Sequence, residues 1–108
     1  MDDEIISQGK LENALEYLAQ TDHEYAFEKA NLERSEIVRK RIRARFFLTL
    51  DGTVADRQAG AEGKDEVVQA DEEYIKTVQA FETLKARRQR AEIVIDVWRS
   101  LNASRRKA

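Results

Sequence analysis

Five cations fall within seven residues of the segment RKRIRARFF, which spans residues 39–47. They are Arg39, Lys40, Arg41, Arg43 and Arg45. Such a cluster can bind the phosphates of a nucleic acid, because each contact releases condensed counterions. The same cations could instead pair with carboxylates elsewhere in the chain. No RNP-like aromatic motif, zinc-finger spacing or helix-turn-helix pattern accompanies them, so we favour the pairing interpretation and keep phosphate binding as the alternative.

The C-terminal segment ASRRKA supplies a second basic cluster, which could contact phosphate or simply remain solvated. The net charge of −2 implies no general attraction to polyanions, so any such binding must be local. The candidate contacts with a nucleic acid or a partner are Arg39, Lys40, Arg43, Arg45, Arg105, Arg106 and Lys107.

Catalytic and metal-binding patterns are missing from the sequence. It contains no glycine-rich phosphate loop, no HExxH motif and no pair of carboxylates with a reason to be buried. His23, the single histidine, stands near a predicted helix start, without carboxylates at metal-ligand spacing or a nucleophile nearby, and cysteine is absent. We therefore expect a protein that is not an enzyme and holds no metal or cofactor.

The composition is that of long, solvent-exposed helices. Charged residues make up 37% of the 108 residues, alanine is frequent, and proline is absent. We therefore predict one all-α domain. No apolar stretch approaches the roughly 20 residues that span a bilayer, and the acidic N-terminus does not resemble a secretory signal. A cytoplasmic protein with no membrane contact is the expectation.

Helix signals divide the first half of the chain at Thr21. We predict a first helix over about 7–20 and a second over 22–50, because Thr21 and Glu24 have the spacing of a capping box. Asp51 and Gly52 then supply a stop signal.

A linker over 51–64 follows this stop signal. Within it, Thr53 and Asp56 can cap a short helical turn that reaches Ala59, where Gly60 and Gly63 should break it. We predict a third helix over 65–103 and a basic, fraying tail over 104–108.

The short linker forces the two long helices into an antiparallel hairpin that resembles a coiled coil, with the first helix packing on its free end through Leu11, Leu15 and Leu18. Ile37 should then lie near Val78. The apolar stripe predicted to face the third helix is Phe27, Ala30, Ile37, Ala44 and Leu48. The stripe predicted on the third helix is Tyr74, Val78, Phe81, Leu84, Ala91, Ile95 and Trp98, interrupted by Arg88.

Charge alternates in blocks that match this hairpin. Residues 1–36 hold ten anions and three cations, whereas 37–48 hold five cations and no anion. Residues 49–84 then hold nine anions and three cations, and 85–108 hold eight cations and two anions. An antiparallel hairpin brings opposite blocks together and penalises a parallel or slipped pairing. The run of cations at 39–45 should therefore lie beside Asp71, Glu72 and Glu73.

Three aromatic residues are candidates for an interface. Phe46 and Phe47 cannot both face one partner, since adjacent helical positions are about 100° apart. One could cover Val54 in the linker while the other contacts a second subunit. Trp98 could be a core residue or an interface anchor. Two helices bury a single stripe poorly, so we expect a homodimer.

Two segments, FFLTLDGTVADRQAGAEG and AEIVIDVWRSLNASRR, resemble small helical proteins of tailed bacteriophages and prophages. The matching residues are Gly52, Thr53, Val54, Arg57, Ala59 and Trp98 to Leu101, with Ala59 one place short of that family's Arg-x-x-Ala spacing. The resemblance carries no catalytic residue. It implies an accessory viral protein encoded near recombination and replication functions.

Three functions are open at this point. The first is a non-enzymatic interaction or adaptor protein that binds a partner in phage DNA metabolism or a host factor. The second is direct nucleic-acid binding through residues 39–45 and the basic tail. The third, association of the terminal helix with a membrane surface, is disfavoured because Asp96 interrupts its apolar face.

Overall fold

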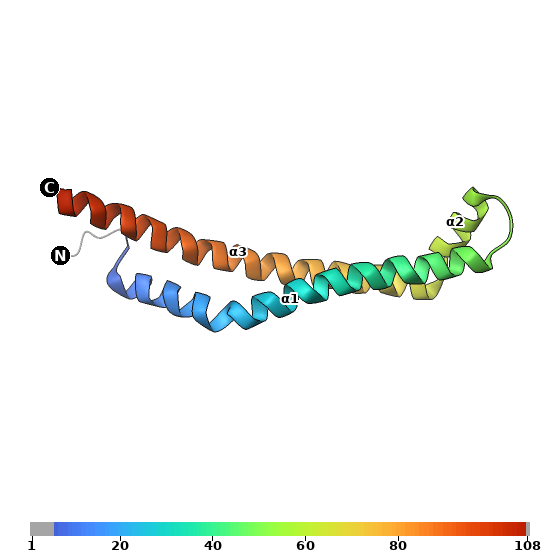
Figure 1. The fold of residues 1–108 in the computed structure, drawn as a ribbon, viewed down its shortest axis with the longest axis horizontal. Coiled ribbons are helices and arrows are strands. Elements are labelled where there is room, and N and C mark those ends of the chain that lie inside the picture. The colour runs from blue at the N-terminus through green and yellow to red at the C-terminus, as the bar shows by residue number, and fades with distance from the viewer. Residues whose placement is uncertain (1–5, 108) are drawn as a thin grey trace. The chain divides into compact units, whose positions relative to one another are not determined.

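The computed structural model describes residues 6–107, and the side chains of residues 6–106. These residues form three helices, α1 (Gln8–Thr49), α2 (Val54–Glu62) and α3 (Asp65–Lys107), and no strand (Figure 1). The prediction of an all-α fold is confirmed. The last helix continues through most of the expected basic tail to Lys107 instead of ending at residue 103, and Ala108 lies outside the described residues.

The chain divides into two compact units, which are described separately. The terminal unit joins the part of α1 up to Ala26 with the part of α3 from Glu82 onward. The central unit runs from Phe27 to Phe81 and contains α2. Within the central unit Ser35 contacts Thr77 while Arg43 contacts Asp71, so the paired segments of α1 and α3 are antiparallel, as predicted for the hairpin.

Helix α1 is continuous through Thr21, so the predicted break between helices over 7–20 and 22–50 is wrong. The Thr21 hydroxyl donates to the carbonyl oxygen of Tyr17 at 2.7 Å, and the side chain is buried. A threonine that bonds to the preceding turn in this way stays inside a helix and does not cap a new one. The predicted stop is confirmed, because α1 ends at Thr49 and Gly52 adopts a positive φ of 106°.

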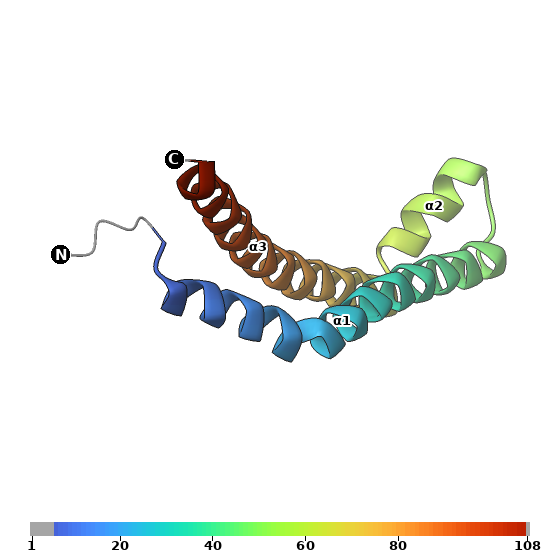
Figure 2. The ribbon, with the colours of Figure 1, turned by 60° about the vertical axis from the view of Figure 1, so that its left-hand side comes forward.

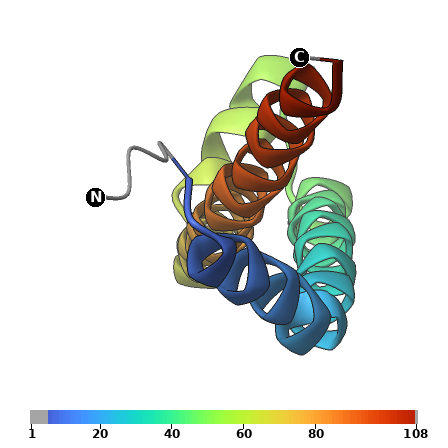
Figure 3. The same cartoon turned by 90° about the vertical axis from the view of Figure 1, so that its left-hand side faces the viewer.

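The core of the terminal unit lies between the N-terminal part of α1 and the C-terminal part of α3, the blue and the orange-to-red segments that face the viewer in Figure 3. Ala14, Ala91 and Ile95 are buried. Leu11, Tyr17, Leu18 and Val94 pack around them. The expected packing of the first helical segment on the end of α3 is confirmed for Leu11 and Leu18, whereas Leu15 is exposed.

Helix α2 begins with the predicted capping box and lies beside the last turns of α1 (Figure 2). The Asp56 amide donates to the Thr53 hydroxyl at 3.1 Å, and the Thr53 amide donates to the Asp56 carboxylate at 3.3 Å. The predicted end at Ala59 is wrong, since α2 continues through Gly60 to Glu62. A Cβ on Gly60 would lie 2.9 Å from Leu50 Cδ1. Glycine here therefore permits a close approach and does not break the helix.

The seam of the central unit is mixed on the α1 side, where the polar Ser35 and Arg39 share one row with the half-buried Leu32, Ile42 and Phe46. The apolar stripe predicted for that side, Phe27, Ala30, Ile37, Ala44 and Leu48, is exposed instead. The half-buried positions that contact α2 or α3 include Ser35, Arg39 and Arg43. A different row of α1 from the predicted one therefore faces α3. Ser35 opposite Thr77 also shifts the register by about one turn from the predicted proximity of Ile37 and Val78.

The stripe predicted on α3 is correct. Phe81, Leu84, Ala91 and Ile95 are buried. Tyr74, Val78 and Trp98 are half-buried. Helix α3 therefore supplies most of the buried apolar surface of both units, while α1 contributes short or polar side chains at many of the facing positions.

Gly52 gives the first testable prediction. Its φ of 106° disfavours side chains, and an added Cβ would lie 3.1 Å from Asp56 Oδ2 and 3.2 Å from Asp56 Cβ. We expect Gly52→Ala to lower the free energy of unfolding by roughly 1–3 kcal/mol. The matched control is Gly63→Ala, because Gly63 has a φ of −82° and an added Cβ would meet only ordinary contacts. Urea denaturation followed by circular dichroism measures both, and equal losses would contradict the interpretation.

Candidate interaction surfaces

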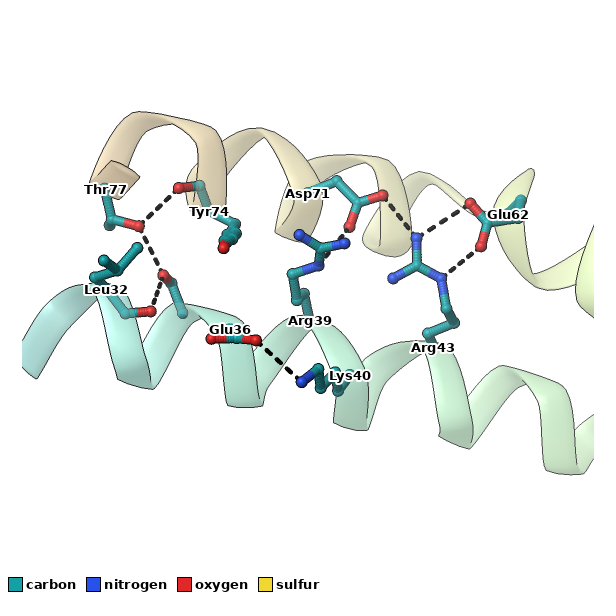
Figure 4. Close-up of polar contacts among 10 residues, drawn as sticks. Leu32, Glu36, Arg39, Lys40, Arg43, Glu62, Asp71, Tyr74 and Thr77 are labelled. Carbon is teal, nitrogen blue, oxygen red and sulfur yellow. Dashed lines mark hydrogen bonds and ion pairs between the residues drawn. The ribbon is translucent and has the colours of Figure 1, made fainter. Parts of the chain in front are cut away.

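Three charged side chains, Arg43, Asp71 and Glu62, tie the three helices of the central unit together (Figure 4). Arg43 Nη2 donates to Asp71 Oδ2 at 2.8 Å and to Glu62 Oε2 at 3.1 Å, and Arg43 Nε also donates to Glu62 Oε1. The planar guanidinium suits this arrangement because it presents several donors in a fixed fork. One α1 side chain thus holds both α2 and α3.

Arg39 completes this cluster one turn earlier on α1. Its Nε lies 3.3 Å from Asp71 Oδ1, and its guanidinium carbon lies 4.4 Å from the centre of the Tyr74 ring. The Arg39–Asp71 contact is an ion pair without hydrogen-bond geometry, so Arg39 Nε and Asp71 Oδ1 are both buried without a hydrogen-bond partner. Asp71 therefore lies between two guanidinium groups, although its hydrogen bond goes to Arg43 alone.

The ionisation of these groups follows from their contacts. Hydrogen bonds from Arg43 hold the pKa of the Glu62 carboxyl below its ordinary value, and those bonds to Glu62 and Asp71 raise the pKa of Arg43. Because the carboxyl pKa is lowered by folding, its contribution to stability is present above the ordinary pKa of glutamate. That contribution is lost as the pH falls through the lowered value. The ion pair is therefore intact at neutral pH.

The remaining cations of the run differ in their partners. Lys40 Nζ lies 3.0 Å from Glu36 Oε1, one turn away on the same helix. Arg41 and Arg45 are exposed and make no hydrogen bond or ion pair with the part of the chain that the structure describes. The pairing interpretation is thus confirmed for Arg39 and Arg43 with Asp71. Glu62, which the sequence did not single out, is an additional partner.

Phe46 and Phe47 are both half-buried where α1 meets the linker. The Arg57 guanidinium carbon lies 4.1 Å from the centre of the Phe47 ring, and Arg57 Nε donates to the Phe47 carbonyl oxygen at 3.0 Å. Lys64 Nζ lies 5.7 Å from the centre of the Phe46 ring. Val54, which one phenylalanine was expected to cover, is exposed. Both aromatic residues are therefore engaged by cations of the same unit.

A groove of about 680 Å³ separates α1 from α2. Its lining is mainly Phe47 and four alanines, of which Ala44 belongs to α1 and Ala61 is fully buried. Lys40, Arg43, Gln58 and Glu62 complete the lining. The groove is therefore mainly apolar but includes charged side chains.

An exposed row of side chains runs along α1 within the central unit. We name it the α1 stripe, and it consists of Phe27, Ala30, Arg34, Ile37, Arg41, Ala44 and Leu48. Phe27 is 62% exposed, Ile37 48% and Leu48 74%. Its residues follow one another at alternating steps of three and four, so they occupy one side of the helix. The sequence revealed this periodicity but not that the row faces away from α3.

Arg88 is the principal polar residue in the seam of the terminal unit. Its Nη1 donates to the Leu18 carbonyl oxygen at 3.0 Å and to the Thr21 hydroxyl at 2.6 Å, and Nη2 donates to Asp22 Oδ1 at 2.8 Å. The Tyr25 ring centre lies 5.0 Å from its guanidinium carbon. Arg88 therefore reaches a carboxylate at the edge of the seam and fixes the local register of the two helices.

The candidate contact residues at the C-terminus do not line a common binding site in the part of the chain that the structure describes. Arg105 and Arg106 are exposed, the side chain of Lys107 lies outside the described residues, and the half-buried Trp98 lines a shallow depression with Arg106. His23 is exposed. Within residues 6–106, no group of three histidine or acidic side chains lies close enough to hold a metal ion. None of the described helices offers an apolar stretch that could cross a bilayer.

No protein-family model matches the chain, and comparisons with curated proteins and with solved structures find no similar protein.

Removing the carboxylate of Asp71 tests the structural role of the cluster. We expect Asp71→Asn to lower the free energy of unfolding by about 1–3 kcal/mol, because two half-buried guanidinium groups lose a charged partner. Glu72→Gln is the matched control, since it removes one exposed carboxylate from the adjacent position. Urea denaturation compares the two variants. Equal stability of Asp71→Asn and wild type would show that the ion pairs contribute nothing net.

Proposed function

We propose that the protein is a non-enzymatic helical interaction protein and that the α1 stripe is the surface through which it binds another protein chain. The observation that supports this most directly is the alignment of Phe27, Ile37 and Leu48 on one exposed side of α1. Single exposed apolar residues are ordinary, whereas a contiguous row of them is typical of an interface.

The dimensions of the α1 stripe support the same proposal. From Phe27 to Leu48 it extends over about 32 Å at 1.5 Å per residue. That length suits a helix of a partner, which buries residues at steps of three and four in the same way. Arg34 and Arg41 lie within the row, and their aliphatic stems can cover apolar surface while their charges remain at its edge.

The biological setting is part of the proposal. The resemblance of the linker and C-terminal segments to small helical phage proteins favours an accessory role in DNA metabolism, or in binding a host factor, in the host cytoplasm. The engagement of Arg39 and Arg43 by carboxylates supports protein binding over phosphate binding, since these two guanidinium groups already have anionic partners.

Photo-crosslinking in the native host tests the proposed function. With p-benzoylphenylalanine at position 37, we expect light-dependent adducts to a protein chain, because the probe replaces a residue in the middle of the interface. The matched control carries the probe at Ile75, which is 64% exposed in the same unit but lies on α3. Equal labelling at positions 37 and 75 would contradict the proposal. So would the absence of labelling when the probe is placed in turn at positions 27, 37 and 48.

Direct nucleic-acid binding is the second candidate, supported by the exposed and unpaired Arg41 and Arg45. Each phosphate contact should contribute about −0.9 to the slope of log K against log salt on duplex DNA. We therefore expect the double variant Arg41→Gln/Arg45→Gln to reduce that slope by about two if these residues bind DNA. Lys76→Gln, at an exposed lysine of α3, is the control. Absence of binding by wild type at low salt would reject this function.

A further inference from the structure

We propose that the α1 stripe binds the α1 stripe of a second copy of this chain, and that the two helices run antiparallel. This inference rests on the proposed function, because it assigns a partner to the same surface. The proposed interface consists of exposed residues of α1. It does not use Phe46, Phe47 and Trp98, which the sequence suggested as interface residues.

The spacing of the α1 stripe is that of a coiled-coil seam. Residues 27, 30, 34, 37, 41, 44 and 48 follow a strict heptad pattern over three repeats. Five of these seven positions are apolar. Ser35 and Arg39 contact α3 from the other side of α1, so the heptad positions are directed away from α3. Coiled-coil packing against a second helix is the arrangement that buries such a row completely.

One antiparallel alignment matches long side chains with short ones. When Phe27 lies opposite Ala44 of the second copy, Arg41 lies opposite Ala30 of the second copy. Near the two-fold axis, Arg34 then lies opposite Ile37 of the second copy. Long residues that face alanines allow the two helices to approach closely, and the arginine stems cover apolar surface while their guanidinium groups reach solvent.

Charge at the edge of the α1 stripe selects the same alignment. Glu33 and Lys40 flank the stripe on one side, seven residues apart, and both are exposed. In the antiparallel alignment, Glu33 of each copy lies next to Lys40 of the other, which gives two symmetric ion pairs. Glu33 makes no ion pair or hydrogen bond with the described part of the chain, so its carboxylate is available. Lys40 needs only to leave Glu36, an exposed pair of low energy.

A parallel dimer is disfavoured by the same residues. It would place Arg34 against Arg34 and Arg41 against Arg41 of the second copy. It would also bring Lys40 next to Arg45 of the second copy, since these residues flank the seam on opposite sides. Four repulsive contacts and no attractive one result, because the contact of Lys40 with Arg45 occurs twice. The charge pattern therefore specifies both the orientation and the register.

The first experiment measures the association of the full-length chain by sedimentation equilibrium. We expect wild type to dimerise and Ile37→Glu to raise the dissociation constant by about tenfold or more, because two charged groups would enter the seam of each dimer. Ile75→Glu is the control, since it places the same charge on an exposed isoleucine outside the α1 stripe. Circular dichroism verifies that both variants remain folded. Equal weakening by both, or dimers of unchanged strength in Ile37→Glu, would overturn the inference.

The second experiment tests the register by charge exchange. Glu33→Lys and Lys40→Glu should each weaken self-association, because like charges then meet at both symmetric positions. An equimolar mixture of the two variants should form heterodimers as strongly as wild type, since every edge pair again joins opposite charges. The double variant should likewise dimerise as wild type does. A mixture that associates no better than either variant alone would overturn the antiparallel register.

The outcomes separate this inference from the proposed function. If wild type is monomeric but a probe at position 37 labels a different protein in cells, the second copy is not the partner and the interaction function stands. If wild type is monomeric and the probe labels nothing, both proposals are wrong. If the probe labels the chain itself and charge exchange restores dimers, both are supported.

Discussion

The central unit depends on the guanidinium of Arg43, which holds a carboxylate of α2 and a carboxylate of α3 at the same time. Because a guanidinium donates hydrogen bonds only in its own plane, this one group restricts the positions of both helices relative to α1. Arg39 adds a second positive charge to Asp71 and lies over Tyr74. These ion pairs form only when both the charges and the directions of the side chains match. They therefore restrict rotation of α1 more than apolar contacts alone would.

In the central unit, the seam and the α1 stripe occupy different sides of α1. A helix has one side toward its partner, and in the central unit that side carries Ser35, Arg39 and Arg43. The same side also carries the half-buried Leu32, Ile42 and Phe46, and the exposed α1 stripe lies on the other side. In the terminal unit the apolar side of α1 faces α3, since Ala14, Leu11 and Leu18 pack against that helix. One continuous helix thus has a buried apolar side in one unit and an exposed apolar side in the other.

The sequence predicted an all-α hairpin, the α3 stripe and the α2 capping box correctly, because these depend on local chemistry or on one dominant apolar row. It failed at Thr21, where the pattern of a capping box competes with a bond to the preceding turn that only tertiary burial favours. It also failed in choosing which side of α1 faces α3, since both sides of this helix carry apolar residues at helical spacing. The pairing of Arg39 and Arg43 with Asp71 was predictable from charge blocks, but the role of Glu62 required the docked position of α2.

Arg57 joins the end of α1 to the start of α2 by packing on the Phe47 ring and binding the Phe47 carbonyl oxygen, a partner only ten residues away in the chain. The contact between Arg88 and Leu18 spans 70 residues. Closure of a short loop loses little chain entropy and takes roughly 10–100 ns for ten residues. Folding should therefore nucleate at this turn and proceed outward, so that the contacts between α1 and α3 in the terminal unit form last.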